Sequence, residues 1–381
     1  MDSLFFNVFK TMNLENKDNN ITDERIRKIS WYKALLTRPE SGALLGVIFV
    51  FAFFLIIVGD SGMFGAYGSM NFLRLSAELG ILAVFGAMLM IGGEFDLSIG
   101  SMIGFAGLCL SIPIAYYDWP IWQALLFAFS MAILVGFFNG LIVTKTGLPS
   151  FVVTLAMLFI LRGLCLALTR AITNKTQVPL VDRLPDNSIL VTMFSGKAFG
   201  PIFVWMADRG WIHTLPDGSP MAEGIPASIL WWIFVTALTT WILLKTRFGN
   251  WIFASGGDKV GARNIGVPVD RVKITLFIGT ACAATLFASI QVLSMQSADS
   301  LRGMLKEFEV IIACVVGGCL LTGGYGSAIG ASLGALIFGT VYLGIYYTNV
   351  DTDYFKVFLG IMLLLAVLFN NYIRKIITQI K

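Results

Sequence analysis

The feature that most constrains this chain is a succession of long apolar segments separated by shorter polar ones. Most of them reach the roughly 17–25 apolar residues that cross a bilayer as a helix. We expect about ten transmembrane helices, at residues 42–58, 73–92, 98–116, 121–143, 150–169, 226–244, 274–296, 308–322, 328–347 and 353–372. The runs are continuous and lack the alternation of a membrane β-barrel, so the sequence predicts an all-α integral membrane protein.

Composition agrees with a protein held mostly in lipid. Hydrophobic residues make up 57% of the chain and charged residues 13%, against about 45–50% and about 25% in a soluble domain. The net charge of +4 fits basic loops on one side of a membrane, and we expect no nucleic-acid partner. There is no Cys-x-x-Cys or Cys/His spacing, and His213 has no metal-ligand company, so neither a disulfide framework nor a metal site is expected. The chain also lacks a phosphate-binding P-loop pattern.

Residues 245–273 form the longest interior polar run, between two expected spans. The run holds two acids, Asp258 and Asp270, and six basic residues: Lys245, Arg247, Lys259, Arg263, Arg271 and Lys273. Loops with such an excess stay in the cytoplasm. A short helix is expected over 258–264, with glycines before it and Gly266 and Pro268 after it. From spacing alone, this loop either docks another protein or only joins two spans.

The topology follows from this placement. An even number of spans puts both termini on the side of that loop, the cytoplasm. We expect a cytoplasmic N-terminal segment (1–41), a transmembrane domain (42–372) and a cytoplasmic tail (373–381). The transmembrane domain includes an external loop (170–225). The N-terminal segment does not have the pattern of a secretory signal.

Glycine is the second organising feature. Gly100/Gly104, Gly136/Gly140 and Gly330/Gly334 are GxxxG pairs, which allow close helix packing in lipid. The eighth expected span is short, and glycines crowd its end, which indicates a broken helix. The similarity of SIGSMIG (98–104) to AIGASLG (328–334) is interpreted as shared packing chemistry and not as an internal repeat.

Polar residues near the span ends are candidates for a solute path. In GGEFDLSIG (92–100), Asp96 and Ser98 either cap the third span or face a polar pathway, and Glu94 needs water or a partner. Asn139 and Thr154 bond either another helix or a solute. Arg162 lies about 18 Å into its span, where it pairs with a group such as Glu78, reaches the headgroups, or lines the path.

These motifs, in this order, resemble the permease subunits of ribose/xylose-type sugar importers of the ATP-binding cassette (ABC) class. The resemblance runs from about residue 70 to the C-terminus. The matching residues are Gly92–Gly93, Asp96–Ser101, Asn139–Leu141, Thr144–Lys145, Pro149, Phe151–Leu155, Leu161–Leu164, Thr246–Gly249, Gly256–Gly257, Ala262–Arg263, Gly266–Val267, Arg271–Lys273, Glu307–Glu309, Val315–Gly318, Leu321–Gly324 and Gly326–Ser327.

The resemblance implies an ABC importer permease fold with glycine-interrupted helices, in the bacterial inner membrane. It implies a second permease copy, in a homodimer or a heterodimer, with the solute path between the copies. It also implies a cytoplasmic ABC ATPase and a periplasmic binding protein that delivers a monosaccharide or similar small polyol. ATP and Mg would belong to the ATPase, so we expect no cofactor on this chain and no enzyme activity of its own.

Roles for particular residues follow from the resemblance and the topology. Coupling to the ATPase is expected at Arg247, Gly249, Gly256, Gly257, Ala262, Arg263 and Gly266. The path candidates are Glu94, Asp96, Ser98, Asn139, Thr154 and Arg162. Glu307 and Glu309 are expected on the outer face, together with loop 170–225, as the docking surface for the binding protein.

Two departures and one competing class stay open. GGEFDLS is one residue longer than the common family form GGIDLS, and loop 170–225 is longer than usual, so ribose itself is not transferred to this chain. The competing class is an ion-coupled secondary transporter or channel, which often places acids or histidines deep in its helices. Away from the span ends, Glu78 and Arg162 are the candidates here, so the chain has few titratable groups for a proton relay. A purely structural scaffold would leave the basic loop and the broken segments unexplained.

Overall fold

The computed structural model describes residues 39–185, 188–348, 350–351, 353–362, 364–365 and 368. All of them belong to one compact unit that begins at Pro39. Most of the expected N-terminal segment, the expected tail and part of the tenth expected span (353–372) lie outside the described residues. The described residues are predominantly helical, which confirms the all-α fold class.

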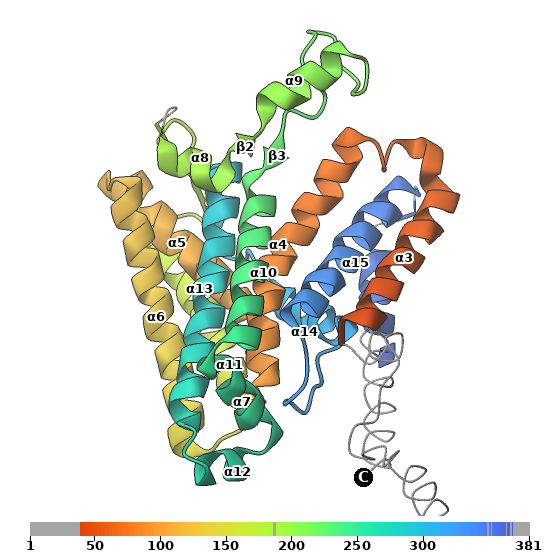
Figure 1. The fold of residues 1–381 in the computed structure, drawn as a ribbon. Coiled ribbons are helices and arrows are strands. Elements are labelled where there is room, and N and C mark those ends of the chain that lie inside the picture. Colours follow the sequence, from red (N-terminus) through yellow and green to blue (C-terminus); the bar gives the residue numbers. More distant parts are fainter. Residues whose placement is uncertain are drawn as a thin grey trace, which may run out of the picture. The chain divides into compact units, whose positions relative to one another are not determined.

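Eight helices in the described part of the chain are long and apolar enough to cross a membrane. They are α3 (Pro39–Val58), α4 (Ala66–Ile91), α5 (Ile99–Tyr117), α6 (Ile121–Thr146), α7 (Ser150–Thr173), α10 (Ala227–Lys245), α13 (Val269–Met295) and α15 (Ala328–Tyr347) (Figure 1). Each corresponds to an expected span. The expected span 308–322 corresponds only to α14 (Lys306–Val316), a helix of 11 residues.

Prolines set the starts of four of these spanning helices. Pro120, Pro149, Pro226 and Pro268 are the N-cap residues of α6, α7, α10 and α13. Proline has no N–H to lose and cannot continue a preceding helix, so each of these helices begins sharply. Gly147 ends α6 with φ 71°, a left-handed conformation that glycine adopts without strain. The turn from α6 into α7 is therefore only a few residues long.

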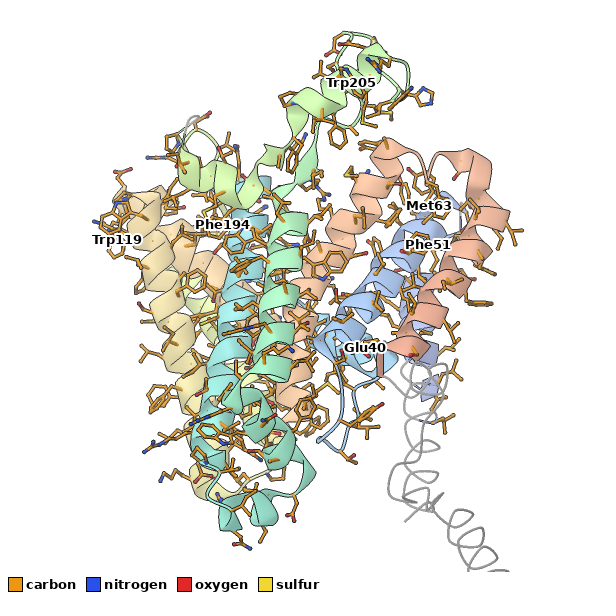
Figure 2. The ribbon with its side chains drawn as sticks, viewed as in Figure 1. Glu40, Phe51, Met63, Trp119, Phe194 and Trp205 are labelled. Carbon is orange, nitrogen blue, oxygen red and sulfur yellow. The ribbon has the colours of Figure 1, made fainter. Side chains whose placement is uncertain are left out.

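Short elements occupy both ends of the spanning helices. At one end lie α8 (Ile189–Ser195) and α9 (Gly200–Asp208), and at the other α11 (Arg247–Gly257) and α12 (Lys259–Asn264). We call these ends the α9 end and the α12 end. Strand β1 (Gln177–Pro179) pairs antiparallel with β4 (Ser297–Asp299), and β2 (Lys197–Ala198) with β3 (Ile225–Pro226). A 3₁₀ turn, η1 (Gly59–Ser61), follows α3. Trp119 and Trp205 lie toward the α9 end (Figure 2).

Two of the three expected GxxxG pairs bring helices together. A Cβ placed on Gly136 or Gly140 of α6 would lie 2.6 Å from the Cα of Ile278 or Ile274 of α13, so these backbones are nearly in contact. Gly334 of α15 packs in the same way on a backbone carbonyl of α14. The third pair, Gly100/Gly104, packs on a non-helical segment instead, described below.

Helix α3 joins the other helices through its own apolar cluster. Phe51 of α3 and Met63, which is fully buried, pack there with residues of α4 and α15 (Figure 2). At the start of α3, Glu40 accepts a hydrogen bond of 2.6 Å from the hydroxyl of Ser327, the N-cap residue of α15. Apolar contact and this polar contact together hold α3 against α15.

Candidate functional site

The connector between α4 and α5, residues 92–98, is the centre of a buried polar cluster. Asp96 Oδ1 accepts hydrogen bonds from the Ser98 N–H (2.9 Å) and the Ser98 hydroxyl (2.5 Å). Its Oδ2 accepts one from the hydroxyl of Thr280 on α13 (2.7 Å). Burial is the largest influence and raises the pKa of the Asp96 carboxyl, while the Ser98 and Thr280 hydrogen bonds lower it.

Helices α6 and α7 hold the same connector from another direction. Asn139 of α6 donates from Nδ2 to the Ser98 hydroxyl (3.0 Å). Thr154 of α7 accepts from the Leu97 N–H (3.1 Å), and Ser150 accepts from the Phe95 N–H (3.0 Å). The structure therefore brings five of the six path candidates together: Asp96, Ser98, Asn139 and Thr154 make these hydrogen bonds, and Glu94 lies in the same connector.

An ion pair closes the cluster toward the α12 end. Lys273 Nζ, four residues into α13, pairs with Glu94 Oε1 in the connector. The two side chains are only 5% and 11% exposed. A buried charge without a partner is costly, and this contact supplies the partner that Glu94 needs.

These contacts clamp the connector between α13 on one side and α6 and α7 on the other. Most hydrogen bonds of the cluster residues are made to one another. Among these residues, Asn139 Oδ1 has no hydrogen-bond partner within the described part of the chain. Sequence reasoning missed Ser150, Lys273 and Thr280 as members. Lys273 was counted as a charge of the basic loop, and a serine or threonine within a helix gives no distinctive signal.

Arg162 lies apart from this cluster, and Glu78, named above as one possible partner, does not bond to it. Its Nη1 donates to the backbone carbonyls of Ser300 (3.3 Å) and Arg302 (3.1 Å). Glu78 instead accepts from Gln291 Nε2 (2.8 Å). The guanidinium is thus occupied by a non-helical segment whose carbonyls are available as acceptors.

Replacing Arg162 with leucine is expected to lower the folded yield of the chain, because two carbonyls in a partly buried segment lose their donor. Each buried acceptor left unsatisfied costs about 1–3 kcal/mol. Arg162→Lys keeps one donor group and should recover part of the yield. Size-exclusion chromatography of detergent-solubilised protein measures this, and normal yield for Arg162→Leu would show that the contacts do not stabilise the fold.

Three glycine pairs from separate parts of the chain meet near the α12 end: Gly92–Gly93, Gly256–Gly257 and Gly323–Gly324. They follow α4, end α11 and lie in the loop between α14 and α15. The Gly324 N–H donates to the carbonyl of Ile91 (2.8 Å), and a Cβ placed on Gly93 would lie 3.2 Å from the Cα of Gly256. We call this contact the glycine junction. It packs the end of α11 directly against the start of the connector.

The glycine junction has room for a side chain at Gly257 but not at its neighbour Gly256. A Cβ on Gly256 would lie 1.8 Å from the Ile91 carbonyl oxygen, whereas one on Gly257 would meet nothing closer than 4.0 Å. Gly256→Ala should therefore lower the melting temperature, because backbone must move, and Gly257→Ala should leave it unchanged. Thermal unfolding of both variants tests this, and equal melting temperatures would contradict the close packing.

The expected short helix of the basic loop is confirmed as α12. Asp258 caps it by accepting from the N–H groups of Val260 and Gly261, at 3.0 Å each. The preceding helix, α11, was not expected; Thr246 caps it by accepting from the Gly249 N–H (3.1 Å). Both helices lie at the α12 end (Figure 1).

Of the seven expected coupling residues, Gly256 is partly buried in the glycine junction, and the other six are either exposed or buried. Arg247, Gly257, Arg263 and Gly266 are exposed, and Arg263 pairs with Asp270. Gly249 and Ala262 are buried; Ala262 is 4% exposed and packs on Val267 and Val269. Two large apolar side chains are exposed here, Val260 of α12 (68%) and Ile265 at its C-cap (78%), and sequence reasoning missed both.

The expected placement of Glu307 on an external docking surface is wrong. Glu307 is 5% exposed, and a Cβ placed on Gly100 would lie 1.9 Å from its Oε2. Glu309 is partly buried and pairs with Lys306. The segment was expected outside because it follows a span and carries charge, but it folds back along α5.

The loop 170–225 supplies the exposed charge at the α9 end. Asp208 and Asp217 are exposed there, and Glu223 pairs with Lys197. The chain from Phe199 to Gly224 leaves and returns through the paired strands β2 and β3, so α9 projects on a narrow stem (Figure 1).

Comparison with known proteins finds one family model over most of the chain. The family described as "Branched-chain amino acid transport system / permease component" matches residues 68–367. No solved structure matches the chain.

Three relatives from Escherichia coli (strain K12) match nearly their full length. The xylose transport system permease protein XylH is 28% identical over 352 residues, covering 85% of this chain and 90% of that protein. The probable ABC transporter permease protein YphD is 30% identical over 340 residues, covering 89% and 92%. The ribose import permease protein RbsC is 28% identical over 302 residues, covering 79% and 84%.

Proposed function

This chain belongs to the family of branched-chain amino acid transport system permease components, and we propose that it is the permease subunit of an ATP-driven importer for a monosaccharide or similar small polyol. The near full-length similarity to XylH carries this proposal. The family description names amino acids, but two of the three relatives are named for xylose and ribose. We favour a sugar because those two relatives are similar over most of this chain.

The ATPase would dock on α12 from the cytoplasm, with its ATP and Mg on its own chain. Val260 and Ile265 offer an exposed apolar surface for this contact. From there, two routes lead to the connector 92–98: the glycine junction, and α13 through the Lys273–Glu94 pair. ATP-driven closure can favour one permease conformation only through such differential contacts.

The remaining assignments extend this proposal. The α12 end faces the cytoplasm, and so do both termini. A second copy completes the solute path, as homodimer or heterodimer, and a periplasmic binding protein docks at the α9 end. The exposed acids of the α9 loop would govern the on-rate of that protein and the choice of partner.

A loop variant tests the docking assignment. Joining Ala198 to Ile225 by a two-residue turn removes α9 but keeps both paired strands. We expect weaker stimulation of ATPase activity by the loaded binding protein and unchanged basal activity, because α9 and α12 lie at opposite ends. An unchanged half-saturation concentration at low salt would exclude α9 from the docking surface.

The substrate class is tested through the binding protein. Calorimetry of the binding protein encoded beside this chain, against pentoses, hexoses and polyols, should identify a sugar or polyol ligand. The same ligand should then stimulate ATP hydrolysis by the reconstituted complex. A binding protein that takes only branched-chain amino acids would overturn the sugar assignment and leave the importer class intact.

A further inference from the structure

The non-helical segment between α13 and α14 folds back into the protein along α5. Successive residues of this segment meet α5 glycines in reverse order. Cβ atoms placed on Gly107, Gly104 and Gly100 would lie 3.9 Å from Ala298 Cβ, 3.3 Å from the Ser300 carbonyl and 2.6 Å from the Gly303 carbonyl. Because α5 runs toward the α9 end, the segment runs away from that end.

Arg162 fixes the depth of this segment. Arg162 is 12 residues after the start of α7, a helix of 24 residues, so it lies about 18 Å along the helix, near its middle. The carbonyls of Ser300 and Arg302 bond to its side chain, so they lie within one arginine side-chain length of that depth, and both also contact Gly104 of α5. Residues 297–305 and α14 therefore form one broken crossing, with an extended first half and a helical second half. This replaces the eighth expected span, 308–322.

The segment is only half covered by the rest of the chain. Its exposed side chains are Leu301 (46%), Met304 (58%) and Leu305 (44%), and Phe308 (44%) follows in the first turn of α14. Non-helical backbone at membrane depth occurs where it is buried in protein or lines a water-filled cavity, not where it faces lipid. Since these residues are exposed in the single chain, something other than lipid must face them.

The charged residues of the segment also indicate that it does not face lipid. Arg302 and Lys306 are partly exposed at this depth, as is Asp299. Charged groups within the membrane face the bundle interior or water and mark substrate pathways. Arg302 bonds the Ser297 carbonyl (2.8 Å), and Lys306 pairs with Glu309.

We infer that residues 297–308 form one wall of the water-filled solute path, with Leu301, Met304 and Phe308 facing the solute. This inference rests on the proposed function, because it places the wall in an importer path between two copies. The charged groups on the wall are hydrogen-bonded or ion-paired within the chain, so the wall offers apolar surface and satisfied polar groups. Such a wall suits an uncharged polyhydroxylated solute, which it contacts without binding tightly.

Cysteine labelling in nanodiscs tests the inference. Leu301→Cys, Met304→Cys and Phe308→Cys, each in the full assembled transporter, are exposed to a charged water-soluble thiosulfonate reagent. The matched control is Leu134→Cys, near the middle of α6 and 46% exposed. The unsubstituted chain gives the background of its five native cysteines. We expect the three wall positions to react roughly tenfold or more faster than the control, because water reaches them and not the lipid-facing position.

The outcomes separate this inference from the proposed function. Reaction only with a lipid-soluble maleimide would mean that the segment faces lipid, and spontaneous cross-links between copies with no labelling would mean a dry interface. Either result overturns the inference. Labelling needs no transport, so water-accessible wall positions in a chain that fails to import sugar would overturn the proposed function alone.

Discussion

Replacing Lys273 with methionine is expected to lower the stability of this chain more than any other single change considered. Its partner Glu94 would be left as an unpaired charge at a site where the two side chains are only 5% and 11% exposed. Removing one member of a buried ion pair costs about 3–5 kcal/mol. That is a large part of the roughly 5–15 kcal/mol that stabilises a typical protein. The connector would also lose its contact with the start of α13, so uptake should fall with the stability.

Thermal unfolding monitored by size exclusion measures this effect. Glu94→Gln should resemble Lys273→Met, while the double variant Glu94→Leu/Lys273→Met should recover most of the stability because no charge is then left unpaired. The control is Lys356→Met. Its pair with Asp353 is 68% and 79% exposed, so it should contribute at most about 1 kcal/mol. Equal melting temperatures for Lys273→Met and Lys356→Met would contradict the buried pair.

Replacing Ile265 or Val260 with aspartate should separate ATP hydrolysis from uptake. Both side chains are exposed at the α12 end, at 78% and 68%, so the isolated permease should fold normally. In the docked complex a new carboxylate would be buried without a partner. Losses of about 2 kcal/mol or more are typical of apolar anchors at an interface centre, roughly 30-fold in affinity.

Pull-down of the ATPase and sugar uptake measure this second effect together. The control is Val204→Asp in α9, at the opposite end and 48% exposed, which should leave ATPase binding unchanged. Normal ATPase binding by both α12 variants would remove this helix from the docking surface.

The sequence predicts the elements whose signals are local. The lengths of the spans and the short helix over 258–264, set between glycines and Pro268, are read directly from neighbouring residues. The depth of residues 297–305 could not be predicted in this way. The charges of this segment are typical of a surface loop. The groups that hold the segment, Arg162 and the α5 glycines, are more than a hundred residues away in the sequence.

In the candidate site, too, the local motif could be predicted but its long-range partners could not. The motif GGEFDLSIG correctly marked the connector as unusual, because a carboxylate at a span end needs partners. Which partners it has depends on tertiary packing: Thr280 and Lys273 come from α13. The partners of Arg162 could not be predicted either, because its acceptors are backbone carbonyls, which every residue has.

The most direct test of the central claim is uptake by reconstituted vesicles that contain this permease, its ATPase and its binding protein. Radiolabelled ligand of the binding protein is supplied with or without ATP on the ATPase side, and with or without a protonophore. An importer predicts accumulation that requires both ATP and the binding protein and is unaffected by the protonophore. Accumulation without ATP that the protonophore abolishes would contradict this account and identify an ion-coupled transporter instead.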